Sequence, residues 1–177
     1  MVDDGTFKFV GSGPETVMFD VIGIPAPQGS KSAFVRNNRA VVVDGSSASG
    51  RAKHAAWRSA VAQRADAVRG VTSFSGPVRV KICFYLPLPS SSPHRVLHSS
   101  RPDLDKLIRS VLDSLTDSGL IRDDALVSEI WAEKLYARDG HWTGASIQVV
   151  DRSDEEEQLG RISRNQARLA PRKKNLK

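Results

Sequence analysis

The chain has 177 residues and a formal net charge of +6, because 26 Lys and Arg residues outnumber 20 Asp and Glu residues. This length favours a single domain, and a hydrophobic content of 40% argues against wholesale disorder. One cysteine, Cys83, excludes an intrachain disulfide or a Cys-rich zinc site, and no apolar run approaches the roughly 18–20 residues of a membrane span, so we expect a soluble, cytoplasmic protein with no membrane partner.

The charge is unevenly distributed along the chain. Residues 28–109 hold fourteen basic and four acidic side chains, a net charge of +10, whereas residues 110–157 hold four basic and twelve acidic ones, a net charge of −8. The last twenty residues add seven basic side chains and no acidic one. Clustered positive charge is typical of surfaces that bind nucleic acid, so residues 28–109 are the expected contact region.

The first half of the chain predicts strands followed by one helix. Val17 to Ile24 is β-branched and apolar, which favours a strand, and the Pro- and Gly-containing segment 25–32 ends it. Residues 33–36 and 39–43 predict a hairpin, because the two Asn residues between them tolerate the positive φ of a tight turn. From Arg51 to Val68 the chain is rich in Ala and free of Pro and Gly, which predicts a helix.

The second half predicts one strand, one helix and two further strands. Residues 78–86 alternate between apolar and polar side chains, as a half-buried strand does, and residues 87–100 form a Pro- and Ser-rich loop. The most regular amphipathic helix begins at Leu104, because the apolar residues that follow recur at helical spacing. Residues 126–137 and 145–150 predict the last two strands.

These elements predict a small single domain of the α+β or mixed α/β class, with a central mixed β-sheet flanked by two helices. The domain is expected to span residues 17–150, after an N-terminal extension over residues 1–16. Residues 151–177 form a charged tail that is poor in bulky apolar residues and expected to be flexible. Part of this tail, from Glu155 to Leu169, has the composition of a helix.

Acidic residues gather at the predicted start of the second helix and just after its end. Asp103 and Asp105 belong to the first turn, and Asp123 and Asp124 follow the helix. If the later segment folded back beside the start of the helix, these carboxylates would suit a hard cation such as Mg²⁺ or Mn²⁺. The alternative is structural: Asp103 as an N-cap, Asp105 facing the helix dipole and the later pair as turn residues.

The longer pattern around these acids narrows the alternatives. The sequence DLDKLIRSVLDSL at 103–115, followed by GLIRDD at 119–124, resembles the signature of the RusA family of Holliday junction resolvases. The segment GIPAPQGSK at 23–31 is similar to the Pro- and Gly-rich loop of that family. The resemblance extends over about residues 18 to 150. Further residues in family order are the strand 78–86, Lys134 and Tyr136.

The resemblance implies a structure-specific endodeoxyribonuclease that resolves four-way DNA junctions in recombination and repair, by Mg²⁺-dependent hydrolysis with Mn²⁺ as a substitute ion. It also implies a homodimer, in which each subunit cuts one strand of branched DNA, in a bacterial or phage-infected cell. By position, Asp103, Asp105 and Asp124 resemble the catalytic, metal-binding triad. The chain departs from the family pattern at Lys106, where the family commonly has Asn, and at Arg109, a catalytic candidate where the family commonly has Lys.

Several cations of the basic block are candidates for contact with DNA. Arg101 adjoins the acidic pair, and the others lie on the predicted hairpin, the loop before it or the second helix. Phosphate contacts give salt-dependent affinity without reading the base sequence. The alternative for each residue is a solvated surface position. The candidates are Lys31, Arg36, Arg39, Arg101 and Lys106.

Two other functions remain compatible with the sequence. One is a catalytically silent protein of the same fold that binds branched DNA, and the other is a related nuclease that acts on other DNA structures. The histidines show no spacing typical of zinc or acyl-transfer chemistry. His94 and His98 share the loop and could approach the site, but a histidine in a loop is usually exposed, and we expect this of both. The three Trp residues predict core or interface positions.

Overall fold

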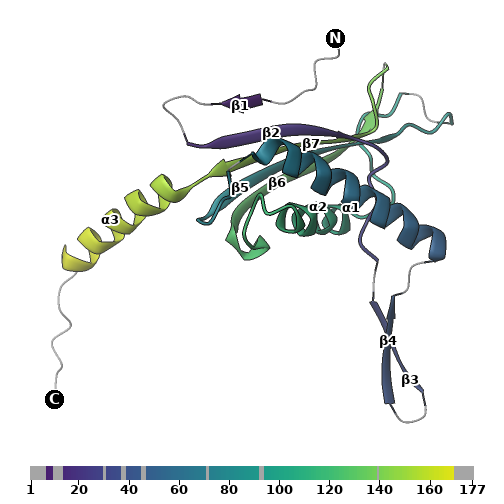
Figure 1. Ribbon diagram of the computed structural model, residues 1–177, viewed down its shortest axis with the longest axis horizontal. Helices are drawn as coiled ribbons and strands as arrows, with labels where there is room; N and C mark the ends of the chain where they lie inside the picture. Colours follow the sequence, from purple (N-terminus) through teal and green to yellow (C-terminus); the bar gives the residue numbers. More distant parts are fainter. Residues whose placement is uncertain are drawn as a thin grey trace.

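The computed structural model describes most of the chain, and Figure 1 shows its arrangement. The residues described are 7–9, 14–29, 31–36, 39–44, 47–70, 72–91, 94–138 and 140–169. Within 7–9, 31–36, 40–44 and 165–169, only the backbone is described.

A five-stranded mixed sheet forms the centre of the molecule. Its strand order is β1 (Phe7–Phe9), β2 (Thr16–Ile22), β7 (Gly144–Asp151), β5 (Val78–Pro87) and β6 (Val127–Ala137). Neighbouring strands are antiparallel except β5 and β6, which are parallel and need a crossover connection. The helix α2 (Leu104–Asp117) lies within this crossover. The predicted α+β domain with a central mixed sheet is therefore confirmed.

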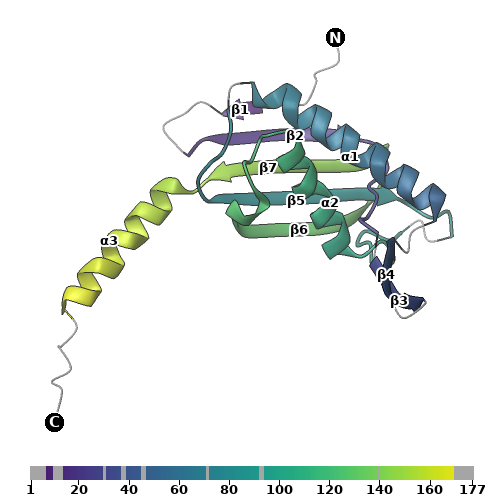
Figure 2. The ribbon, with the colours of Figure 1, turned by 60° about the horizontal axis from the view of Figure 1, so that its bottom comes forward.

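Both helices of the body cover the same face of the sheet (Figure 2). The helix α1 (Ala48–Arg69) begins after Ser47, whose hydroxyl accepts a hydrogen bond from the backbone N–H of Gly50 at 3.0 Å. It buries one stripe of apolar side chains at helical spacing. Trp57, which is 2% exposed, belongs to this stripe and confirms its predicted place in the core. The stripe consists of Trp57, Val61, Ala65 and Val68.

The second helix packs between α1 and the sheet edge. Leu107, Val111 and Leu115 are fully buried, so α2 is fixed by its apolar stripe, as its sequence pattern predicts. Replacing one such leucine by alanine typically costs about 2–5 kcal/mol. A polar interaction also connects the two helices, since the guanidinium of Arg58 of α1 donates a hydrogen bond to the carboxylate of Asp117 of α2. The position of α2 is therefore set along its whole length.

The opposite face of the sheet carries none of the described helices. Met18, on β2, and Trp131, on β6, lie on this face and are 42% and 51% exposed. Trp131 is therefore not a core residue. None of the described helices is long and apolar enough to cross a membrane.

A separate hairpin projects from the body near the start of α1 (Figure 1). Its strands are β3 (Lys31–Arg36) and β4 (Arg39–Asp44), which pair with each other and with no strand of the five-stranded sheet. This confirms the hairpin predicted from sequence. Asn37 and Asn38, the predicted turn, lie outside the described residues.

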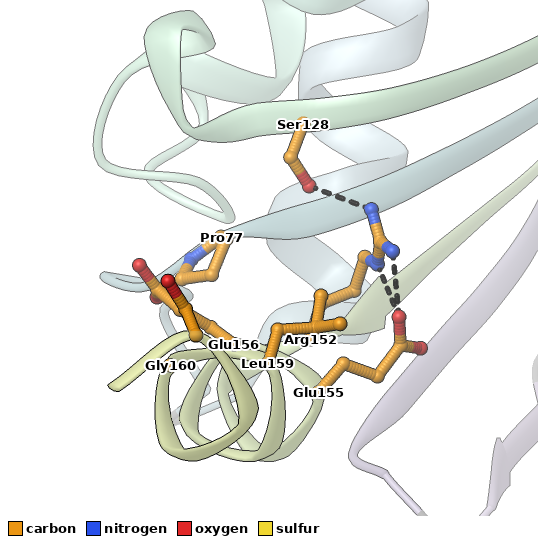
Figure 3. A pocket seen from close by; sticks show the side chains of 8 residues that line it. Pro77, Ser128, Arg152, Glu155, Glu156, Leu159 and Gly160 are labelled. Atoms are coloured by element: carbon orange, nitrogen blue, oxygen red, sulfur yellow. Dashed lines mark hydrogen bonds and ion pairs between the residues drawn. The ribbon is translucent and has the colours of Figure 1, made fainter. Parts of the chain in front are cut away.

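The helix α3 (Ser153–Leu169) leaves the end of β7 and extends away from the sheet (Figure 1). It includes the helix predicted from Glu155 to Leu169. Arg152 holds its first turn, because the guanidinium donates to the Glu155 carboxylate at 2.6 and 2.8 Å and to the Ser128 hydroxyl at 3.0 Å (Figure 3). A hollow of about 430 Å³ lies beside this contact. Arg152 and Glu155 already pair with each other, which indicates that they connect α3 to the sheet and do not bind a ligand.

The sheet extends past both domain boundaries expected from sequence. Thr16 opens β2 and Asp151 ends β7, so strand pairing reaches beyond residues 17–150 at both ends. The N-terminal extension also contains β1, whose Phe7 pairs with Met18 of β2. Backbone hydrogen bonds continue a sheet regardless of side-chain polarity, so composition alone did not mark these ends.

Candidate functional site at the start of α2

The start of α2 presents two carboxylates to solvent. Asp103 occupies the N-cap position, and its carbonyl accepts the first helical hydrogen bond, from Leu107 N–H at 3.2 Å. Its side chain makes no capping hydrogen bond, so the usual structural role of an N-cap Asp is not taken up. Asp105 lies in the first turn and is exposed. Both carboxylates are therefore available to a ligand.

Lys106 is the immediate partner of Asp103, with its Nζ 3.0 Å from Oδ2 of the carboxylate. The hydrogen bond to this ammonium, and then its charge, hold the pKa of Asp103 below its ordinary value, and Arg101 and Lys134 act in the same direction. Asp103 is thus ionised at neutral pH, as a metal-binding carboxylate must be. A cation that binds Asp103 competes with Lys106.

Arg109 lies one turn beyond Asp105 and is exposed. Residues four apart lie on the same side of a helix, so the two side chains can reach a common ligand. Among the described residues, neither forms an ion pair with a neighbour. The planar guanidinium of Arg109 is therefore free to bind an anion such as a phosphate group.

Asp123 and Asp124 lie beyond the other end of α2. Asp123 caps a short 3₁₀ helix, η1 (Asp124–Leu126), because its Oδ1 accepts a hydrogen bond from Ala125 N–H at 2.8 Å. Asp124 is the first residue of η1 and is exposed. The structural alternative therefore accounts for Asp123, whereas Asp124 keeps an unengaged carboxylate.

Within one chain the structure does not bring Asp124 to Asp103 and Asp105. The 14 residues of α2 span about 21 Å at 1.5 Å per residue. The strand β6 covers a similar length. Lys134 contacts the residue before Asp103, and the seven steps along the strand from Val127 to Lys134 span roughly 23 Å. Accordingly, the described residues contain no cluster of three acidic, His or Cys side chains able to hold one metal ion.

Lys134 fixes the backbone that leads into α2. Its Nζ donates hydrogen bonds to the carbonyls of Ser100 at 2.8 Å and Pro102 at 2.7 Å. The sequence predicts no role for Lys134 beyond its place in the family order. No local pattern links a lysine in a strand to a loop more than thirty residues earlier. The structure makes it a positioning residue for Asp103.

His98 lies beside Lys134, and it is buried rather than exposed. It is 9% exposed, its ring centroid is 4.6 Å from that of Tyr136, and its backbone N–H donates to the Lys134 carbonyl at 3.0 Å. Burial, and then the charge of Lys134, lower the pKa of His98. The prediction that His98 is exposed is wrong, because the end of its loop docks along β6. His94 is exposed, as predicted.

The basic candidates lie on both sides of the acidic pair. Arg101 is exposed and precedes it, and Lys106 follows it within the same turn. The loop that leads into the hairpin is tied to α2, because Gln28 N–H donates to the Lys106 carbonyl at 3.1 Å. The backbone of Lys31 and Arg36 lies on β3, and Arg39 is exposed on β4.

Comparison with known proteins identifies the family of this chain. The family model described as endodeoxyribonuclease RusA matches residues 27–149. This range includes the hairpin, α2 and the candidate acids Asp103, Asp105 and Asp124. The chain belongs to the RusA family. It is also 25% identical over 136 residues to the uncharacterized protein YqaN of Bacillus subtilis (strain 168), which covers 71% of this chain and 91% of that protein. Membership of this family supports endonuclease activity and action on branched DNA.

Replacing Lys134 by Met should loosen the entrance to α2. Two carbonyls then lose a charged donor, which we expect to lower the free energy of unfolding by about 1–2 kcal/mol. That loss corresponds to a fall in Tm of roughly 2–8 °C. Thermal unfolding and amide hydrogen exchange at residues 101–107 measure the effect. Lys81→Met, an exposed lysine on the opposite face of the sheet, is the matched control and should leave both unchanged. Equal behaviour of the two variants would contradict the positioning role.

Proposed function

We propose that the protein is a structure-specific endodeoxyribonuclease that resolves Holliday junctions with Mg²⁺, or Mn²⁺ in its place, as a homodimer in the cytoplasm. The observation that carries the proposal is the start of α2, where Asp103 and Asp105 present carboxylates that make neither a capping hydrogen bond nor a core contact. The family match over these residues supports DNA as the substrate.

The exposed oxygens of Asp103 and Asp105 fit a hard divalent cation, which prefers carboxylate ligands and retains several waters. When bound, such an ion activates a water, orients the scissile phosphate and stabilises the leaving oxygen. Arg109 binds a non-bridging oxygen of that phosphate from the same side of α2. Lys134 keeps Asp103 at the helix entrance by holding the carbonyls of Ser100 and Pro102.

The homodimer has a physical reason in the length of α2. Asp124 belongs to the proposed metal-binding set, yet it lies beyond the far end of α2, a helix about 21 Å long, from Asp103 and Asp105 of its own chain. A two-fold dimer makes reciprocal contacts, so Asp124 of each copy would complete the acidic pair of the other. Two such sites, related by symmetry, suit a substrate in which two strands are cut.

The cations around the acidic pair supply affinity for the DNA backbone. Arg101 and Lys106 flank the site, and the hairpin with Lys31, Arg36 and Arg39 projects beside it (Figure 2). Their contacts would orient the junction without reading its base sequence.

A catalytically silent DNA-binding protein is the second candidate, and one observation favours it. Lys106 stands where the family commonly has Asn and forms an ion pair with Asp103, so it opposes binding of a second cation there. Mg²⁺-dependent cutting of a synthetic four-way junction decides between the two. Paired nicks near the crossover support resolution, whereas binding without cutting supports the silent form. Cutting of linear or forked DNA with equal efficiency supports a nuclease of other specificity.

Asp103→Asn and Asp105→Asn should each abolish cleavage while leaving junction binding intact. Removing a metal-binding carboxylate sacrifices several kcal/mol of transition-state stabilisation, a loss of about 100-fold or more in rate. Single-turnover cleavage and gel-shift assays measure the two properties separately. Asp154→Asn is the matched control, since Asp154 is an exposed acid in the first turn of another helix. Unchanged cutting in either active-site variant would refute the assignment.

Mixing Asp105→Asn with Asp124→Asn should restore cutting that neither variant has alone. Each site of the proposed dimer takes Asp103 and Asp105 from one chain and Asp124 from the other. In a dimer of one Asp105→Asn chain and one Asp124→Asn chain, one site therefore carries both substitutions and the other site carries neither. Random reassortment at equal concentrations would then give about one quarter of the wild-type number of intact sites. The products should be nicks in one strand rather than paired cuts. A mixture without activity, from subunits shown to exchange, would mean that the three acids do not act across two chains.

Lys106→Asn, which restores the residue common in the family, should lower the Mg²⁺ concentration needed for half-maximal cleavage several-fold. The substitution removes a positive charge 3.0 Å from the Asp103 carboxylate and so ends the competition for it. Because a phosphate contact is lost as well, junction binding should weaken at low salt. Metal titration of the cleavage rate at saturating DNA separates the two effects. An unchanged metal requirement would show that Lys106 leaves Asp103 when the ion binds.

A further inference from the structure

A preformed hollow of about 320 Å³ adjoins the acidic site. Its walls come from three segments: the loop between β2 and β3, the first turns of α1 and the entrance to α2. We call it the nucleotide pocket and propose that it receives one unstacked nucleotide of the DNA strand that is cut. The inference rests on the proposed function and specifies which part of the substrate is recognised. The residues that carry the argument are Ile24, Pro25, Pro27, Lys53, Pro102 and Lys106.

The floor of the pocket is apolar and held in place. Pro25 and Ala26 are buried, and the loop is fixed at both ends. Gly23 N–H donates to the Thr143 carbonyl at 2.9 Å, and Gln28 N–H donates to the Lys106 carbonyl at 3.1 Å. The Gln28 side-chain amide also donates to Asp113 of α2 at 3.1 Å. Because the walls are already ordered, a ligand would bind without the entropic cost of ordering them.

Among the described residues that line the pocket, the charged side chains are both cationic. Lys53 enters from α1 and Lys106 from α2, and none of these described lining residues is acidic. Lys106 lies between the pocket and the acidic pair, since its ammonium contacts the Asp103 carboxylate. An anionic group bound by the two lysines would therefore lie next to the proposed scissile phosphate. This placement fits the neighbouring phosphate of the same DNA strand.

The apolar surface explains why a whole nucleotide fits better than a phosphate alone. Ile24, at the rim, is 64% exposed, and a second hollow of about 220 Å³ continues along α1 and shares Ile24 and Lys53. A phosphate ion would leave this surface uncovered, whereas a base would bury it. Enzymes that extract a base hold it between apolar or aromatic side chains, and extraction is cheapest where pairing is already disturbed. A strand crossover is such a place, so the pocket would favour junctions over linear duplex.

The decisive experiment uses the full-length protein and a synthetic four-way junction with 2-aminopurine at single positions next to the crossover. The fluorescence of this base rises when it leaves the stack, and none of the described residues that line the nucleotide pocket is aromatic and able to quench it. In EDTA, which permits binding without cutting, the wild type should raise the fluorescence at one position about twofold or more. Lys53→Glu should remove the rise and Lys53→Arg should retain it. Lys81→Glu, on the opposite face of the sheet, should behave as the wild type.

The salt dependence of binding gives a second readout. Losing one phosphate contact in Lys53→Ala should make the slope of log affinity against log salt shallower by about 0.9, and Lys81→Ala should not change it. If the wild type cuts the junction but no position brightens, or Lys53→Glu brightens equally, the pocket inference is wrong and the proposed function stands. If the wild type neither binds nor cuts the junction, both fail together.

Discussion

The fixed position of the start of α2 is the constraint on which the site depends. The apolar stripe of the helix buries Leu107, Val111 and Leu115 against the sheet and α1, so the helix cannot slide. Lys134 then holds the two carbonyls before Asp103, and Gln28 ties the loop before the hairpin to the first turn. Three segments distant in sequence therefore meet at one helix entrance. The positions of the acidic pair, the flanking cations and the nucleotide pocket all depend on this meeting point at the start of α2.

The same packing explains how opposite charges can be concentrated in a small region. Asp103 lies within reach of Lys106, and Arg101 and Lys134 also lower its pKa, so the carboxylate is ionised and paired at neutral pH. Such an arrangement would allow a DNA phosphate and a divalent cation to bind close together, because the lysines and arginines would offset the repulsion between phosphate and carboxylate. In three dimensions two cations of the basic block 28–109, Arg101 and Lys106, lie close to Asp103, together with Lys134 from the acidic block 110–157.

Much of this structure follows from local sequence patterns, and the rest depends on contacts that local patterns do not contain. The alternation in 78–86 and the apolar spacing after Leu104 predict β5 and α2 because each element buries one face. Asp103 and Asp105 are likewise visible as a pair in the first turn. The anchoring role of Lys134 and the burial of His98 are not, since both arise from a loop that docks along β6. The separation of Asp124 from Asp103 and Asp105 depends on the length of α2 and the direction of β6. The sequence suggests a shared metal site only if the segment after α2 folds back beside the start of the helix, and within one chain it does not.

The balance of charge at the start of α2 gives the proposed dimer a further physical basis. Asp103 and Asp105 contribute two negative charges, and Lys106 and Arg109 contribute two positive ones within the same two turns. Because Arg101 and Lys134 also lie near Asp103, one chain offers a divalent cation no net negative charge, and the ion gains nothing from long-range attraction. A third carboxylate from a second copy would reduce the excess of positive charge and would complete the oxygen ligands that a hard cation prefers. Metal binding and association of the two chains would then stabilise each other, because the ion binds strongly only where both copies contribute.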